Sequence, residues 1–237
     1  MVLDIAQTSQ LLKLQSRNSS ALKQVWTKLN ADSCPRFYNF HLHTTSSDGK
    51  LQVEKLVQQA CAIGLKGMAI TDHHGIEGYQ KAQAIFQNFS LTKSHIRLPH
   101  LWTGVEITSQ LLDVTVHILG YAFDPDHQAM APYLQGHGHG PVGRQASAAN
   151  VINAIHQADG LAVLAHPARY KRSAKVLIPA AASLGIDAVE TYYAYRNTNP
   201  WRPTPGYTEQ VEYLGRQYGL YSTCGTDTHG LDMLIRL

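Results

Sequence analysis

Short runs of apolar, β-branched or aromatic residues recur from Arg36 onward, and most are followed by a polar turn and then by a segment with helical spacing of its apolar positions. This alternation predicts parallel βαβ units with right-handed crossovers. The expected strands are residues 37–43, 67–73, 101–108, 114–122, 161–166, 188–193 and 220–225, and the expected helices are residues 53–63, 75–89, 144–158, 175–184 and 208–218. Four helices are followed by a glycine, which is typical of helix C-caps: Gly64, Gly160, Gly185 and Gly219.

The third and fourth expected strands break this rhythm, because only residues 109–113 separate them. Such a link is too short for a crossover helix and predicts a hairpin. The pattern favours an α/β barrel of seven strands with one irregular segment, and it leaves an open doubly wound sheet as the alternative. Residues 1–35 predict a short helical N-terminal extension and residues 36–237 the barrel. Residues 124–143 form the longest stretch without a pattern and predict a surface or lid loop.

Composition narrows the class of protein. The chain has 237 residues, of which 44% are hydrophobic, enough for one sizeable core, and its formal net charge is only +3. This balance argues against stable binding of duplex nucleic acid by charge. Three widely spaced cysteines do not suggest a disulfide framework, and no apolar run reaches the length of a membrane span. We therefore expect a cytoplasmic protein without membrane contact.

Histidine is unusually frequent, with 13 residues, and imidazoles and carboxylates recur where expected strands end. They are His41 and His43 after the first strand, His73 after the second, Glu106 in the third, His166 after the fifth, and Asp227 and His229 after the seventh, with His117 inside the fourth strand and Asp48 in the turn after the first. Mixed imidazole and carboxylate ligands suit divalent zinc, manganese or iron. Gathered at one end of a barrel, such groups would repel one another without cations.

One His-x-His pair alone carries little information in a chain so rich in histidine. His137 and His139 form a second such pair in a glycine-rich loop, and we expect them to be solvated. Asp72 is expected to orient a ligand imidazole or to cap the following helix. His74 is expected to point away from His73, and the role of Glu190 is left open.

The motifs FHLHTTSSDG, GLKGMAITDHHGIEGY, GVEI, VHILGY, AHPARY and GTDTHG resemble, in this order, those of the PHP (polymerase and histidinol phosphatase) phosphoesterases, most closely the TrpH-type branch. The resemblance runs from about Phe40 to Gly230. It implies a distorted (βα)7 barrel and three groups of metal ligands. These are His41, His43, Glu106 and Asp227 around one ion, Asp48, His73 and His229 around a second, and Glu106, His117 and His166 around a third.

Two departures from the family pattern are visible. Asp48 stands where several branches carry a histidine, which affects metal preference or occupancy at the second site. Only about fifty residues separate His117 from His166, so the long helical insertion that is usual in the TrpH-type branch is expected to be missing.

Clustered divalent ions lower the pKa of a bridging water and align a phosphoryl group for displacement. We therefore expect two or three ions (Mn, Zn or Fe) and hydrolysis of phosphate esters of nucleotides or short oligonucleotides, including short RNA, by a metal-bridged hydroxide. The expected catalytic residues are Asp48, His73, Glu106, Asp227 and His229. Arg169, just after the fifth strand, is expected either to bind phosphate or to lie solvated on a helical turn. A histidinol-phosphate-type small-molecule phosphatase and an amidohydrolase acting on C–N bonds are the alternatives.

Overall fold

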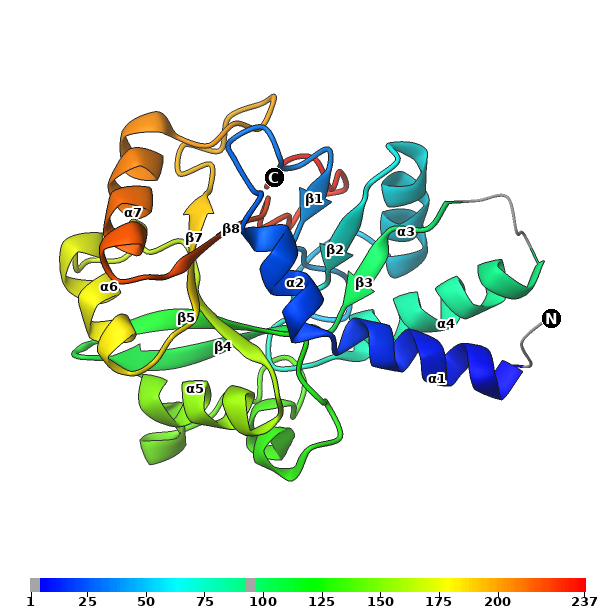
Figure 1. Cartoon of the computed structure of the whole chain (residues 1–237), viewed down its shortest axis with the longest axis horizontal. Coiled ribbons are helices and arrows are strands. Elements are labelled where there is room, and N and C mark those ends of the chain that lie inside the picture. Colours follow the sequence, from blue (N-terminus) through cyan, green and yellow to red (C-terminus); the bar gives the residue numbers. More distant parts are fainter. Residues whose placement is uncertain (1–4, 93–96) are drawn as a thin grey trace.

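The strands form two sheets, as the computed structural model shows for residues 5–92 and 97–237 (Figure 1). The smaller sheet is parallel and has the order β1 (Tyr38–Asn39), β2 (Gly67–Ala69), β3 (His100–Trp102). The larger sheet has the order β4 (Gly104–Leu111), β5 (Val114–Tyr121), β6 (Leu161–Leu164), β7 (Ala188–Tyr192), β8 (Tyr221–Cys224). The predicted α/β class is confirmed, but eight strands in two sheets replace the expected seven strands of one closed barrel.

The difference arises in the third expected strand, which is divided at Thr103. Its first part, β3, pairs with β2, whereas its second part, β4, pairs with β5. Gly104 makes the change of sheet possible, because a Cβ atom there would lie 2.4 Å from the backbone oxygen of Ile70. Any larger residue at this position would clash with the Ile70 backbone, so this close approach requires glycine.

The predicted hairpin is confirmed, since β4 and β5 pair antiparallel over their whole length. The next pair, β5 and β6, is also antiparallel, and the pairs β6–β7 and β7–β8 are parallel. Strand β5 is therefore antiparallel to every other strand of the larger sheet. His117 lies inside this reversed strand and Glu106 lies inside β4, whereas the other candidate residues lie beyond strand ends.

Isolated bridges connect the two sheets near the carboxyl ends of their parallel strands. Leu42 pairs with Thr228, and His73 pairs with Glu106. In addition, the Asp227 N–H donates to the His41 carbonyl at 2.9 Å. These contacts bring the segments that carry the candidate chemistry into one place although no continuous sheet joins them.

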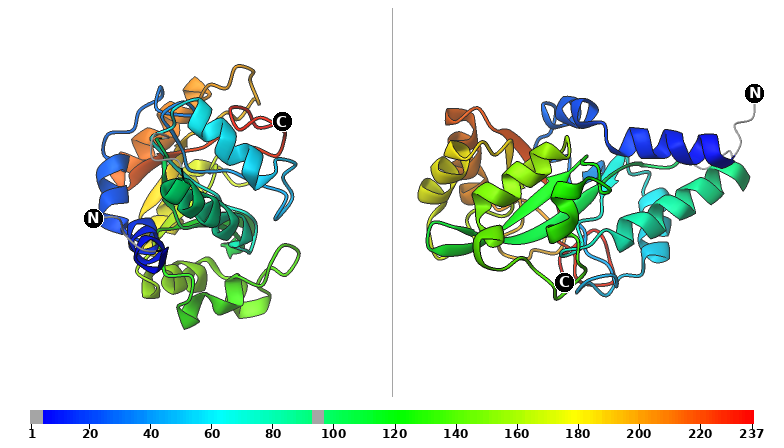
Figure 2. Two further views of the ribbon diagram at one scale, coloured as in Figure 1. Left: turned by 90° about the vertical axis from the view of Figure 1, so that its right-hand side faces the viewer. Right: turned by 90° about the horizontal axis from the view of Figure 1, so that it is seen from below.

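Seven α-helices among the described residues cover the outer faces of the sheets (Figures 1 and 2). They are α1 (Ile5–Ser16), α2 (Ser19–Trp26), α3 (Val53–Ala62), α4 (Glu77–Thr92), α5 (Ala148–Gln157), α6 (Ala174–Ser183) and α7 (Pro205–Gln217). Each of the five helices expected after residue 36 is present, with ends shifted by a few residues. Two 3-10 helices, η1 (Gln128–Tyr133) and η2 (Gly143–Ala146), lie in or next to the predicted loop, so residues 124–143 are not wholly irregular.

The helix C-caps follow the glycine pattern with one exception. Gly64, Gly185 and Gly219 have φ values of +69°, +84° and +67°. After α5 the left-handed residue is instead Asp159, at φ +59°. Gly160 is needed for another reason, because a Cβ there would lie 2.6 Å from that of Phe123.

The N-terminal helices lie against the strands. Leu22 and Trp26 of α2 are buried, and the Trp26 ring meets Tyr121 edge-on with centroids 5.8 Å apart. Helix α1 contacts α4 and β3. The boundary expected after residue 35 stays a prediction.

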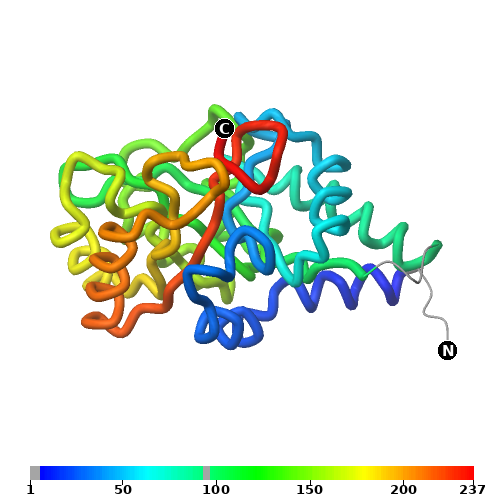
Figure 3. Tube along the Cα trace, turned by 90° about the horizontal axis from the view of Figure 1, so that it is seen from above, coloured from blue at the N-terminus to red at the C-terminus, as the bar shows by residue number. Residues whose placement is uncertain are grey.

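The segment after β8 returns to the turn after β1 (Figure 3). The Lys50 N–H donates to the His229 carbonyl at 3.1 Å, and the His229 N–H donates to the Arg236 carbonyl at 2.7 Å. Across the described residues, none of the helices combines the length and the apolar character that a membrane crossing needs.

Candidate metal centre

Four buried side chains from three segments of the chain converge where the two sheets meet. They are His41, His43, Glu106 and Asp227, each at most 2% exposed; we call them the inner cluster. The Nε2 atoms of His41 and His43 lie 3.1 and 3.0 Å from Glu106 Oε2. They lie 3.4 and 3.2 Å from Asp227 Oδ1. One ligand atom of each residue thus points into a common space.

The backbone around the inner cluster takes special conformations to achieve this. Asp227 and His166 have left-handed φ values of +54° and +27°, which are uncommon for residues other than glycine and often mark functional sites. Gly225 allows its strand to approach His41 closely, because a Cβ at that position would lie 2.1 Å from the His41 Cβ. The positions of these side chains are therefore fixed by the main chain.

A second group, the outer cluster, shares His43 and adds Asp48, His73 and His229. Asp48 Oδ2 lies 3.2 Å from His229 Nε2 and 3.6 Å from His73 Nε2, and Asp48 Oδ1 lies 3.5 Å from His43 Nδ1. The side chains of His73, His229 and Asp48 are 13%, 18% and 36% exposed. The outer cluster is therefore open to solvent on one side.

Glu106 connects these clusters to two further imidazoles. Its Oε1 atom lies 2.7 Å from His117 Nδ1 and 3.4 Å from His166 Nε2. Besides the inner and outer clusters, two further groups of described residues have ligand atoms within 4.8 Å of one another. They are His73–Glu106–His117 and His41–His166–Glu190. The structure thus brings all nine sequence-predicted residues together, although His117 and His166 fall into separate groups.

The inner cluster has the chemistry of a cation site. His41 Nδ1 lies 2.9 Å from Glu190 Oε1, and donation of its proton to that carboxylate leaves a lone pair on Nε2. That lone pair faces oxygens of Glu106 and Asp227. Electron pairs that face one another in a buried space need a cation between them, so these donors fit a divalent ion such as zinc, manganese or iron.

The pKa values of the inner-cluster histidines in the absence of a metal ion also indicate that the carboxylates favour a positive charge nearby. Burial alone would lower the pKa of His43, but hydrogen bonds to Asp227 and Glu106 raise it to about 9. Burial would likewise lower the pKa of His41, yet the charges of Glu190 and Glu106 raise it well above its ordinary value. Where no metal is bound, protons therefore supply the charge that the carboxylates attract.

The outer cluster has a different electrostatic balance. Burial lowers the pKa of His73 to about 4, against the opposing pull of Glu106. Burial would raise the pKa of Asp48, but a hydrogen bond from His229 and the nearby imidazoles lower it well below its ordinary value. His73 is thus neutral and Asp48 ionised near pH 7, which are the forms that bind metal ions.

Three donors hold the second oxygen of Asp227. Tyr193 Oη donates to Asp227 Oδ2 at 2.6 Å, and Arg169 Nη1 and Arg236 Nε each donate to it at 2.9 Å. The predicted residue Arg169 therefore lies at the edge of the inner cluster, with its side chain 38% exposed. Sequence analysis missed Tyr193 and Arg236, and the only available signal was their closeness to Glu190 and His229 in the chain.

Asp72 has neither of its two expected roles. Its Oδ1 accepts from the Thr44 N–H and the Ser47 hydroxyl, both at 2.7 Å, and its Oδ2 accepts from the Thr44 hydroxyl. It therefore fixes the turn that carries Asp48. His74 does not point away from His73 as expected, since both imidazoles line one cavity with ring centroids 6.1 Å apart. It belongs to none of the ligand groups, and its Nε2 atom lies 3.1 Å from the Thr108 hydroxyl.

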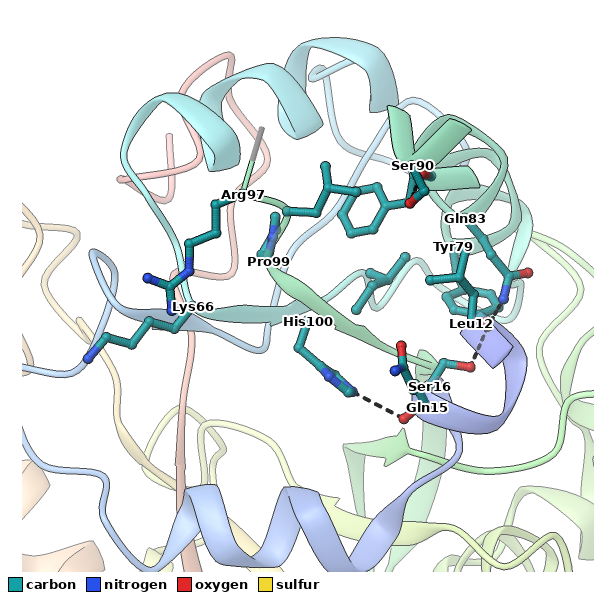
Figure 4. Close-up of a pocket in the computed structure, with 13 residues that line it drawn as sticks. Leu12, Gln15, Ser16, Lys66, Tyr79, Gln83, Ser90, Arg97, Pro99 and His100 are labelled. Carbon is teal, nitrogen blue, oxygen red and sulfur yellow. Dashed lines mark hydrogen bonds between the residues drawn. The ribbon is translucent and has the colours of Figure 1, made fainter. Parts of the chain in front are cut away.

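A cavity of about 410 Å³ lies beside the outer cluster and is lined by Asp48, His73, His74, Thr108, His117, His137, Gly138, Gly140 and Pro141. His137 is exposed as expected, but it lines this cavity and is not part of a remote surface. Another cavity, of about 360 Å³, lies between α1, α4 and the start of β3 (Figure 4). None of the candidate site residues lines this second cavity.

Comparison with known proteins agrees with this chemistry. A family model described as "PHP domain" matches residues 39–158, about half of the chain. The chain is 27% identical over 261 aligned residues to the 5'-3' exoribonuclease Rnm of Salmonella typhimurium, covering 81% of this chain and 85% of that protein. It is 32% identical over 143 residues to a 5'-3' exoribonuclease of Haemophilus influenzae, covering 56% of this chain and only 49% of that protein.

The fold also has a counterpart among solved structures. The structure of a proposed metal-dependent phosphoesterase from Bifidobacterium adolescentis superposes with a TM-score of 0.64 at 22% identity. The match covers 81% of this chain and 87% of the other. At this identity the likeness establishes the fold.

Proposed function

The chain belongs to the PHP domain family, and on that premise we propose that it is a metal-dependent phosphoesterase that hydrolyses nucleotides or short oligonucleotides. The observation that carries this proposal is the convergence of the inner and outer clusters around Glu106. The resemblance to 5'-3' exoribonucleases supports short RNA as a substrate.

The proposed grouping of ligands is the one that the family resemblance implies, and the inner and outer clusters support its first two members. The inner cluster would hold one ion, and Asp48, His73 and His229 would hold a second. His117 and His166 with Glu106 would hold a third, with Glu106 shared. Manganese, zinc or iron suits these donors, and such ions supply activation of water and neutralisation of phosphoryl charge when bound.

The residues around the clusters have defined tasks in this proposal. Glu190 accepts the Nδ1 proton of His41 and so keeps Nε2 free to bind metal. Tyr193 and Arg236 fix the orientation of Asp227, so that Oδ1 faces His41 and His43. All three therefore act as positioning residues.

Arg169 is proposed to bind a phosphate oxygen. Its known contacts to Asp227 and Tyr193 both use Nη1. A guanidinium has five N–H donors, so others remain for a substrate, and its side chain is 38% exposed. We further propose that the chain lacks the long insertion usual in the TrpH-type branch, because only about fifty residues separate His117 from His166.

The test is a substrate panel with the manganese-loaded protein. Mononucleotides, nucleoside bisphosphates, short RNA, histidinol phosphate and a set of amides are incubated with it, and phosphate, nucleotide or amine release is measured. We expect metal-dependent cleavage of nucleotides or short RNA, lost in His41→Ala and retained in His156→Ala, whose imidazole pairs with Asp187 on the surface at 2.8 Å. Hydrolysis of amides alone, or of histidinol phosphate alone, would contradict the proposal in favour of one of the two alternatives.

A further inference from the structure

We propose that His137 contacts the nucleoside part of the substrate next to the phosphate that is cleaved, and that residues 136–140 form a fixed substrate-binding wall. This inference rests on the proposed function. It assigns a role to the glycine-rich loop that neither the family motifs nor the metal clusters explain.

The position of His137 is the first reason. The cavity of about 410 Å³ is lined by the proposed metal ligands Asp48, His73 and His117 and also by His137, Gly138 and Gly140 of the loop. The ring centroids of His73 and His137 are 6.2 Å apart. A substrate whose phosphate reached the outer cluster through this cavity would therefore pass next to His137.

The access to the clusters is the second reason. His41, His43 and Glu106 are at most 1% exposed, so a substrate cannot approach them from the inner side. The side chains of Asp48 and His117 are 36% and 30% exposed, and both line the cavity. The open side of the proposed metal site is therefore the side that the loop faces.

The loop is tied to the site by its backbone. The Gly136 N–H donates to the His74 carbonyl at 2.7 Å, and the His139 N–H donates to the Gly136 carbonyl at 3.1 Å. Gly140 lies against the His74 imidazole, where a Cβ would be 3.0 Å from Nε2. Since His74 directly follows His73, the loop keeps a fixed position relative to the outer cluster.

The chemistry of an exposed imidazole suits a nucleoside. The ring can stack on a base, as aromatic and histidine side chains do in RNA recognition, and its nitrogens can hydrogen-bond to a ribose hydroxyl. Among the described residues, His137 belongs to none of the groups whose ligand atoms lie within 4.8 Å of one another. Its geometry therefore favours contact with the substrate over contact with a metal ion.

His139 provides a matched control, because it is an exposed histidine of the same loop that does not line the cavity. His137→Ala, His137→Phe and His139→Ala are compared with the wild type, all manganese-loaded. Four quantities are measured: kcat and KM for a ribodinucleotide, the inhibition constant of inorganic phosphate, and the affinity for manganese.

We expect His137→Ala to raise KM on the order of tenfold, the usual size of a lost base-stacking contact, with a smaller change in kcat. The phosphate inhibition constant and manganese affinity should stay within about twofold, because inorganic phosphate lacks the nucleoside that His137 is proposed to contact. His137→Phe should restore much of the lost affinity, and His139→Ala should resemble the wild type.

Three results would overturn this inference while leaving the proposed function intact. They are an unchanged KM in His137→Ala, an equal rise of KM in His139→Ala, and a loss of manganese affinity in His137→Ala, which would make His137 a metal ligand. A wild-type protein that cleaves no phosphoester would instead refute the proposed function, and this inference with it.

Discussion

The inner and outer clusters use the same kinds of side chain but differ in their access to water. The four inner residues are at most 2% exposed, whereas Asp48 of the outer cluster is 36% exposed. A buried site of low dielectric strengthens every charge interaction and leaves no water to replace a lost ligand. We therefore expect the inner ion to be held permanently and the outer ion to exchange.

The largest expected effect comes from breaking the inner cluster. Asp227→Ala removes a proposed ligand and leaves Arg169 and Arg236 without their shared acceptor. We expect kcat to fall by about three orders of magnitude or more, with loss of one bound ion per chain measured by elemental analysis. An active variant with a full complement of metal would show that Asp227 is not a ligand.

Breaking the outer cluster should have a smaller effect. Asp48→Ala should lower kcat by on the order of a hundredfold while the inner ion stays bound. Asp48→His restores a ligand and should recover much of the activity, with a changed preference between manganese and zinc. Equal loss of both ions in Asp48→Ala would show that binding of the inner ion also depends on Asp48.

The role of Glu190 can be separated from that of the ligands. Glu190→Gln removes the charge that faces His41 but keeps an oxygen that can accept its proton. We expect manganese affinity at the inner site to fall about tenfold, the lower end of the range for residues that support a metal ligand. Titration with a fluorescent metal indicator measures this change, and an unchanged inner affinity would show that Glu190 has no supporting role.

The smallest expected effect is on thermal stability as a function of pH. In the metal-free protein the pKa of His43 is raised to about 9. A raised pKa stabilises the fold at pH values below the unfolded value of about 6.5, and this stabilisation is lost as the pH rises through 9.

The Tm of the metal-free protein should therefore fall by a few degrees between pH 7 and pH 9, as differential scanning calorimetry can measure. The manganese-loaded protein should show no such fall in this window, because the metal ion replaces the proton. A parallel decline in both forms would place the titrating group outside the inner cluster.

Much of the candidate site could be predicted because strand ends are visible in the sequence. Apolar runs mark the strands, so His41, His73 and Asp227 could be placed at the carboxyl ends before the fold was known. The division at Thr103 was not visible, because nothing in the local pattern indicates that Gly104 must lie against Ile70. The family resemblance supplied the grouping of ligands, which spacing alone left open.

The positions of residues in segments without hydrophobic periodicity could not be predicted from the sequence. Arg236 lies in a C-terminal stretch with no helical or strand periodicity, and its contact with Asp227 depends on how that stretch folds back. His137 seemed a solvated loop residue for the same reason. Long-range backbone contacts, such as Gly136 to His74, decide where such loops lie.

The reversed direction of β5 determines where this protein can tolerate insertions in its sequence. Most ligands follow a strand end, so their loops can lengthen without turning the side chain around. The position of His117 is set instead by the register of the β4–β5 hairpin, in which His117 pairs with Thr108 across the turn at residues 112–113. A slip of one residue in this hairpin would turn His117 to the opposite face. Insertions near that turn should therefore be tolerated only when they leave the alternation of the hairpin intact.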